Sequence, residues 1–150
     1  MALPTRSLRR RSSSPRKDAG VKVMALDYGS ARTGVAVSDP TGTLARPIGV
    51  VAQAGSENGL AELARLAREE DVERVVVGLP LTMRGTHGEQ AAETERFVEV
   101  LRGVLDVSVE LFDERFTTDL AQQTAGAAPE DALAAAHLLS TYLEWCAARS

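Results

Sequence analysis

The chain has 150 residues, a length that excludes two ordinary domains. It is 44% hydrophobic and 25% charged, a composition typical of a globular protein. No run approaches the roughly 18 consecutive apolar residues that a membrane-spanning helix needs, so no membrane partner is expected. The single cysteine, Cys146, cannot form an internal disulfide, which fits a reducing cytoplasm. We therefore expect a cytoplasmic protein of one main domain.

The net charge of −4 divides unevenly along the chain. Residues 1–20 hold six basic residues and one acidic residue, are rich in Ser and Pro, and show no apolar period. They are predicted to form a disordered basic tail, either a solvated extension or an aid to nucleic-acid affinity. The remaining domain, residues 21–150, holds 11 basic and 20 acidic residues. Such an acidic body repels phosphate unless its carboxylates hold cations.

The predicted elements begin with a β-hairpin. Two short, Val-rich runs at residues 21–26 and 33–38 are separated by a turn at residues 28–32 that contains a glycine. A third strand is predicted over residues 44–51, after the turn at Thr41-Gly42.

Helices and strands then alternate. A helix is predicted to start at Ser56, a strand to occupy residues 74–79, and a fifth strand residues 107–112, with a helix before it and another from about Pro129. The three helices carry apolar stripes at helical spacing: Leu60, Leu63, Ala64 and Ala67; Phe97, Val100, Leu101 and Val104; Ala135, Leu138, Leu139 and Tyr142. This order predicts an α/β fold with a mixed five-stranded sheet and helices packed on it.

Acidic residues stand where three of these elements begin or end. Asp27 closes the first strand, the Asp113-Glu114 pair closes the fifth, and Asp131 lies in the first turn of the last helix. Asp131 lies on the same helical face as Ala135, and the apolar residues of that face must pack on the sheet. Taken singly, each acid has an ordinary explanation as a turn former, an ion-pair partner or a favourable charge at a helix N-terminus. Strand alternation slightly favours Asp113 over Glu114, because Asp113 shares a face with apolar residues.

Considered together, the acids predict a metal site. Mg²⁺ prefers hard oxygen ligands and is held by few protein carboxylates. Two such ions about 4 Å apart can activate water and stabilise the leaving oxygen of a phosphodiester. We therefore expect Mg²⁺ or Mn²⁺ as the cofactor.

Four motifs cover about residues 21–145 in order. The first consists of Leu26-Asp27-Tyr28-Gly29, Arg32, Gly34-Val35-Ala36 and Ser38-Asp39-Pro40, and the second of Val77-Gly78-Leu79-Pro80-Leu81, Met83, Gly85, Gly88 and Gln90-Ala91. The third consists of Asp113-Glu114-Arg115 and Thr117-Thr118, and the fourth of Asp131, Ala134-Ala135, Leu138-Leu139 and Tyr142-Leu143. In this order they resemble the motifs of the YqgF/RuvX family.

The resemblance implies an RNase H-like fold and a metal-dependent nuclease. It assigns metal binding and catalysis to Asp27, Glu114 and Asp131, and on this ground Glu114 is chosen from the acidic pair. The family is described as Holliday junction resolvases or as nucleases that mature the 5′ end of pre-16S rRNA. We expect the second role, in ribosome biogenesis. The alternatives are resolution of branched DNA and a non-catalytic nucleic-acid-binding adaptor.

Three arginines are candidate contacts for nucleic acid: Arg32, Arg84 and Arg115. Guanidinium groups bind phosphate through two parallel donors, although Arg32 and Arg115 are equally suited to pairing with neighbouring carboxylates. The segment before the last helix, residues 125–129, is short and uncharged, unlike the longer basic stretch common in the family. The absence of a dimer-forming heptad predicts a monomer or a weak dimer.

Overall fold

The computed structural model describes residues 21–79, 88–113 and 130–149. The predicted basic tail of residues 1–20 lies outside these ranges, as do Arg84, Glu114, Arg115 and Pro129.

The described strands form one mixed sheet of five strands in the order β3-β2-β1-β4-β5. β1 (Val23–Asp27), β2 (Arg32–Ser38) and β3 (Ala45–Ala52) follow one another as antiparallel neighbours. β4 (Arg74–Leu79) and β5 (Ser108–Asp113) run parallel to β1. The predicted mixed sheet, including its opening hairpin, is confirmed.

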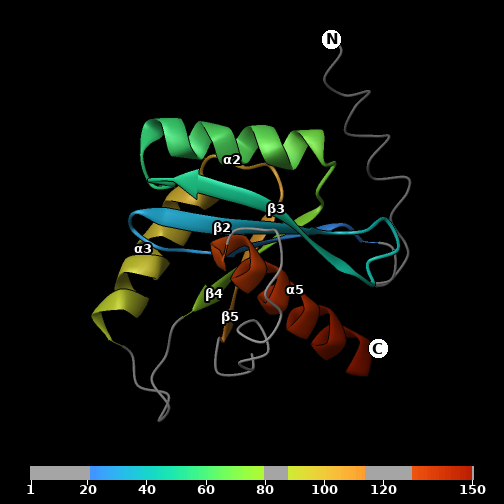
Figure 1. Cartoon of the computed structure of the whole chain (residues 1–150). Coiled ribbons are helices and arrows are strands. Elements are labelled where there is room, and N and C mark those ends of the chain that lie inside the picture. The colour runs from blue at the N-terminus through green and yellow to red at the C-terminus, as the bar shows by residue number, and fades with distance from the viewer. Residues whose placement is uncertain (1–20, 80–87, 114–129, 150) are drawn as a thin grey trace.

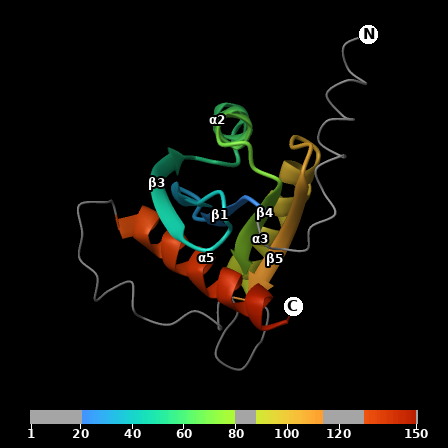
Figure 2. The ribbon, with the colours of Figure 1, turned by 90° about the vertical axis from the view of Figure 1, so that its right-hand side faces the viewer.

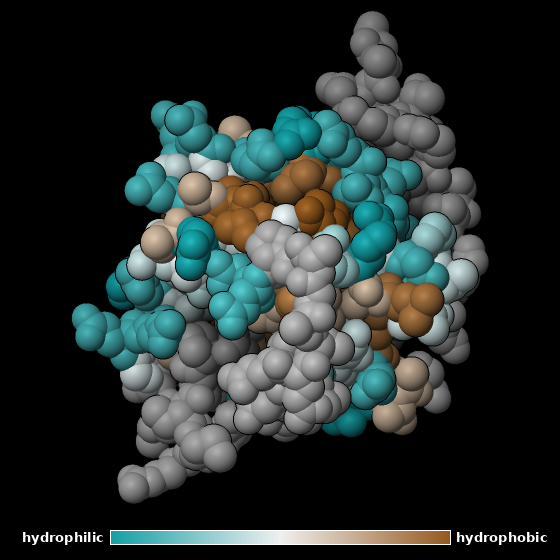
Figure 3. All heavy atoms as spheres, viewed as in Figure 1, coloured by the Kyte–Doolittle hydropathy of each residue, from teal (hydrophilic) through white to brown (hydrophobic). Residues whose placement is uncertain are grey.

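Helices cover both faces of the sheet. α2 (Glu57–Glu69) and α3 (Glu89–Arg102) pack on one face, and α5 (Glu130–Ala148) crosses the other (Figures 1 and 2). In the view of Figure 3, hydrophilic side chains cover the outer side of α2, while apolar ones appear between α2 and the sheet. None of the described helices is long and apolar enough to cross a membrane.

Alternation along β1 separates two cores. Met24 and Leu26 belong to the core shared with α2 and α3, whereas Val23 and Ala25 belong to the core shared with α5. Because successive strand residues point to opposite faces, the next residue on the α5 side is Asp27. The side chain that closes β1 therefore lies on the face that α5 covers.

The start of α2 and the buried face of α5 agree with the sequence predictions. Ser56 caps α2, and its hydroxyl oxygen accepts a hydrogen bond from the backbone N–H of Gly59 at 3.0 Å. All four residues of the stripe predicted for the last helix are buried: Ala135, Leu138, Leu139 and Tyr142.

The buried face of α3 differs from the prediction. Phe97 and Leu101 are buried as expected, but Val100 is 50% exposed, and Val104 is exposed beyond the end of the helix. Thr94, together with Ala91 and Val98, is buried in place of the two valines. The Thr94 hydroxyl donates to the backbone carbonyl of Gln90 at 2.9 Å, which satisfies its polar group inside the helix.

The corrected orientation of α3 leads to a stability prediction. Leu101→Ala should lower the free energy of unfolding by about 2–5 kcal/mol, because it leaves a cavity in the core. Val100→Ala removes side-chain atoms at an exposed position of the same helix and should change it by less than about 0.5 kcal/mol. Urea denaturation of both variants measures the difference, and equal losses would contradict this orientation.

Candidate functional site

The carboxyl ends of three parallel strands meet at one edge of the sheet. Leu26 is level with Val77 of β4, and Leu79 at the end of β4 is level with Asp113 at the end of β5. Open α/β sheets commonly bind ligands at this edge. The predicted residues Arg84, Glu114 and Arg115 follow β4 and β5 in the sequence and lie outside the described residues.

Gly34 brings the first turn of α5 against the strand next to Asp27. A Cβ placed on Gly34 would lie 1.9 Å from the backbone oxygen of Asp131, a distance that no side chain tolerates. Gly34 is also the antiparallel partner of Asp27, and such pairs have Cα atoms about 5 Å apart. Asp27 and Asp131 therefore flank the bare backbone of Gly34 on the same face of the sheet.

Arg32 contacts Asp131 directly. Its Nε lies 3.1 Å from Oδ2 of Asp131, and the two side chains are 69% and 38% exposed. Arg32 and Gly34 stand two residues apart on β2 and so share a face, which explains how the arginine reaches the start of α5. Of the two roles that the sequence left open for Arg32, this structure has the one in which it pairs with a carboxylate.

Asp113 and Asp27 lie on opposite faces of the sheet. Phe112 belongs to the α5 core, and its ring lies edge-on to that of Tyr142 at a centroid distance of 5.3 Å. Val109 and Leu111 pack in the core of α2 and α3, so alternation places Asp113 on that side. The slight preference for Asp113 that its apolar neighbours suggested is thus not supported, since their face is turned away from Asp27.

Tyr28 links the segment after Asp27 to α3, a contact that the sequence analysis did not identify. Its ring stacks on Phe97 with centroids 4.2 Å apart and an angle of 17° between planes. Burial and the nearby Glu93 raise the pKa of Tyr28, while Arg96 opposes this rise. In the sequence, the signal for this contact is an aromatic residue directly after Asp27, the acid that closes β1. No periodic pattern identifies Phe97 as its partner.

A second feature of this segment is the tight turn at Gly29. A Cβ on Gly29 would lie 2.6 Å from the backbone oxygen of Arg32. Glycine therefore allows the chain to fold back immediately after Asp27.

The donor set of Asp27 and Asp131 suits a hard divalent cation. Two carboxylates come from separate elements, and that of Asp131 is partly open to solvent. Mg²⁺ and Mn²⁺ favour such oxygen ligands and leave further positions for water and phosphate. Within residues 21–79, 88–113 and 130–149, no group of three His, Cys, Asp or Glu residues could hold a metal ion.

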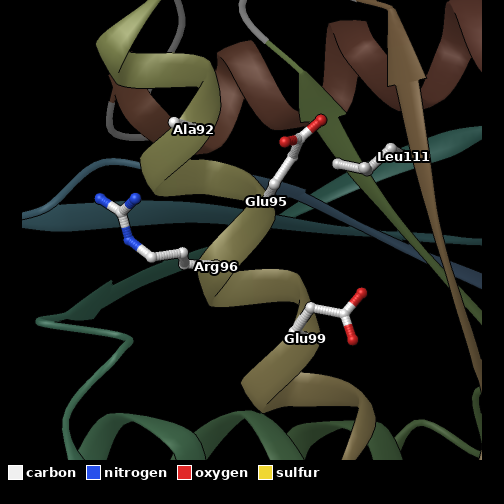
Figure 4. A pocket seen from close by; sticks show the side chains of 5 residues that line it. All are labelled: Ala92, Glu95, Arg96, Glu99 and Leu111. Carbon is white, nitrogen blue, oxygen red and sulfur yellow. The ribbon is translucent and has the colours of Figure 1, made fainter.

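An open depression of about 410 Å³ lies elsewhere, between α3 and β5. In Figure 4, Glu95 and Glu99 point from α3 toward the side of β5, and Arg96 points the other way. Leu111, which also lines the depression, packs on the side of the sheet opposite Asp27. The depression therefore lies away from Asp27, and the carboxylates of Glu95 and Glu99 would repel phosphate there.

A family model described as "RuvX: Holliday junction resolvase" matches residues 21–145. Among curated proteins, a provisionally assigned pre-16S rRNA nuclease of Chloroflexus aggregans is 44% identical over 131 residues, covering 81% of this chain and 92% of the relative. Proteins with the same assignment from Chloroflexus aurantiacus and Syntrophomonas wolfei are 41% and 35% identical, covering 81% and 83% of this chain and 86% and 94% of their own lengths.

Solved structures with a similar fold include two resolvases. RuvC of Thermus thermophilus, determined with a Holliday junction substrate, has a TM-score of 0.55 at 17% identity, covering 83% of this chain and 96% of RuvC. The fowlpox virus resolvase has a TM-score of 0.50 at 13% identity, covering 83% of this chain and 98% of its own. These similarities show the RNase H-like fold expected from the sequence.

The close contact at Gly34 leads to a second prediction. Gly34→Ala should push the first turn of α5 away from β2 and lower the free energy of unfolding by about 1–3 kcal/mol, because the added methyl group meets rigid backbone. Gly49→Ala is the matched control: it lies on neighbouring β3, where an added Cβ meets no atom within 4 Å. It should change stability by less than about 1 kcal/mol. Thermal unfolding compares the two, and a Gly34→Ala variant as stable as Gly49→Ala would contradict the contact.

Proposed function

This chain belongs to the RuvX family, and we propose that it is a nuclease that hydrolyses phosphodiester bonds with Mg²⁺ or Mn²⁺. The observation that carries the proposal is the position of Asp27 and Asp131 on either side of Gly34, at the carboxyl edge of the sheet. Gly34 has no side chain, so the first turn of α5 lies against the strand beside Asp27. This close approach supports a cation shared by the two carboxylates.

Asp27, Asp131 and Glu114 are the proposed ligands. Asp113 lies on the face opposite Asp27, which leaves Glu114 as the proposed member of the acidic pair. A bound ion supplies positive charge for phosphate oxygens and lowers the pKa of a bound water. The carboxylates hold and orient this charge, which explains how a domain with 20 acidic and 11 basic residues can act on a polyanion.

Arg84 and Arg115 are proposed as phosphate contacts near this edge. Each follows a strand that ends there, β4 or β5. Guanidinium donors match phosphate geometry and bind it without reading base sequence.

The proposed substrate is the 5′ region of pre-16S rRNA. Support for pre-16S rRNA comes from the relatives at 35–44% identity, which are provisionally assigned as pre-16S rRNA nucleases and match most of this chain. The second candidate is a four-way DNA junction, favoured by the description of the family model. Cutting a junction on two strands needs two active sites and hence two copies of this chain.

A cleavage assay tests both the activity and the substrate. The full chain with Mn²⁺ should cut RNA carrying the 5′ extension of 16S rRNA faster than a four-way DNA junction. Asp27→Asn should lose activity on each substrate, because one charged ligand is replaced by a neutral amide of similar size. Equal cleavage by the parent and Asp27→Asn would exclude Asp27 from the chemistry, and faster cleavage of the junction would favour the second candidate.

Metal binding without substrate leads to a separate prediction. Mn²⁺ that binds only the folded chain should raise the melting temperature by mass action. Asp27→Asn should reduce that rise and, without metal, should melt no lower than the parent, because it removes a carboxylate from beside Asp131. Asp113→Asn is the matched control on the opposite face and should respond to Mn²⁺ as the parent does. An equal Mn²⁺ response in Asp27→Asn and the parent would mean that Asp27 is not a ligand.

A further inference from the structure

The ion pair between Arg32 and Asp131 places a positive charge at a carboxylate of the proposed metal site. Nε of Arg32 lies 3.1 Å from Oδ2 of Asp131, so this oxygen accepts a charge-assisted hydrogen bond. A divalent cation at the same carboxylate would meet both a blocked oxygen and a like charge a few ångströms away. The arginine and the metal therefore compete for Asp131.

The side chain of Arg32 can move while its backbone is held in the sheet. Arg32 begins β2 and is paired in register with Ala52 of β3, and the adjacent Ala31 accepts a hydrogen bond from the backbone N–H of Gln53 at 2.9 Å. The side chain of Arg32 is nevertheless 69% exposed. Exposed ion pairs contribute little to stability, so exchange of the partner costs little.

We propose that Arg32 is the resident counterion of Asp131 in the metal-free protein and that metal binding transfers its guanidinium from Asp131 to a phosphate of the substrate. This inference rests on the proposed function and adds to it an order of events. With metal absent, Arg32 partly neutralises the acidic site. With metal bound, the guanidinium would be repelled from Asp131, and its donors would be available to a phosphate of the substrate.

Mn²⁺ titration of the full-length protein without nucleic acid tests the competition. Arg32→Gln removes the competing charge and should bind Mn²⁺ about three- to ten-fold more tightly than the parent in isothermal titration calorimetry. Arg32→Lys keeps the charge and should remain near the parent value. Thermal unfolding without metal verifies that each variant is folded.

Arg46→Gln is the matched control. Arg46 is also an exposed arginine paired with a carboxylate: its Nη2 lies 3.2 Å from Oε1 of Glu70, near the end of α2. Arg46→Gln removes one positive charge, as Arg32→Gln does, but keeps the ion pair of Asp131 with Arg32. It therefore measures the effect of the change in net charge alone. It should alter Mn²⁺ affinity by less than two-fold.

Cleavage kinetics test the second half of the inference. At saturating Mn²⁺, Arg32→Gln should raise the KM for RNA by about three- to ten-fold. It should also reduce the slope of log affinity against log salt concentration by about one, as expected for the loss of one phosphate contact. Arg46→Gln should change neither quantity. An unchanged KM in Arg32→Gln would overturn the transfer of Arg32 to substrate.

The outcomes separate this inference from the proposed function. If Mn²⁺ binding is the same in the parent and Asp27→Asn, the metal site itself is wrong. If binding depends on Asp27 but Arg32→Gln and Arg46→Gln behave alike, the site stands and the counterion role of Arg32 is wrong. Weaker Mn²⁺ binding in Arg32→Gln would also overturn it, because Arg32 would then orient Asp131 for the metal instead of competing with it.

Discussion

The first turn of α5 lies directly on the backbone of Gly34, and this contact sets the position of the whole helix on the sheet. A second attachment lies near the other end of α5, where the hydroxyl of Tyr142 accepts from Nη1 of Arg74 at 3.0 Å and donates to Oε1 of Glu110 at 3.2 Å. Buried apolar residues fill the space between them. Asp131 is therefore placed by a helix anchored at both ends, which is how a precise site is held on a rigid scaffold.

The two faces of the sheet have different tasks. The side of α2 and α3 forms the larger core. It includes Met24 and Leu26 of β1 and four alternate residues of β4 and β5: Val75, Val77, Val109 and Leu111. The side of α5 also carries a core, but its edge near Gly34 holds Asp27 and Asp131 instead of apolar residues. Burial on the first side can thus stabilise the fold while like charges are kept together on the second.

This arrangement makes the acidic composition intelligible. Like-charged carboxylates near each other are unfavourable unless a cation lies between them. The guanidinium of Arg32 places one positive charge beside these carboxylates, with its Nε 3.1 Å from Oδ2 of Asp131. The family and the RNase H-like fold agree on a nuclease. The proposed cation at Asp27 and Asp131 would link its affinity for nucleic acid to metal binding.

The sequence by itself determined the order of elements, the hairpin, the capped start of α2 and the buried stripe of α5, because apolar periodicity and local caps are encoded by near neighbours. It also indicated Asp27 and Asp131 through their places at element ends. Only the tertiary structure showed that Val100 faces solvent while Thr94 is buried, that Arg32 pairs with Asp131, and that Asp113 faces away from Asp27. These features depend on which face of the sheet each helix covers and on the close approach of α5 that Gly34 permits. Local periodicity encodes neither the choice of face nor the close approach.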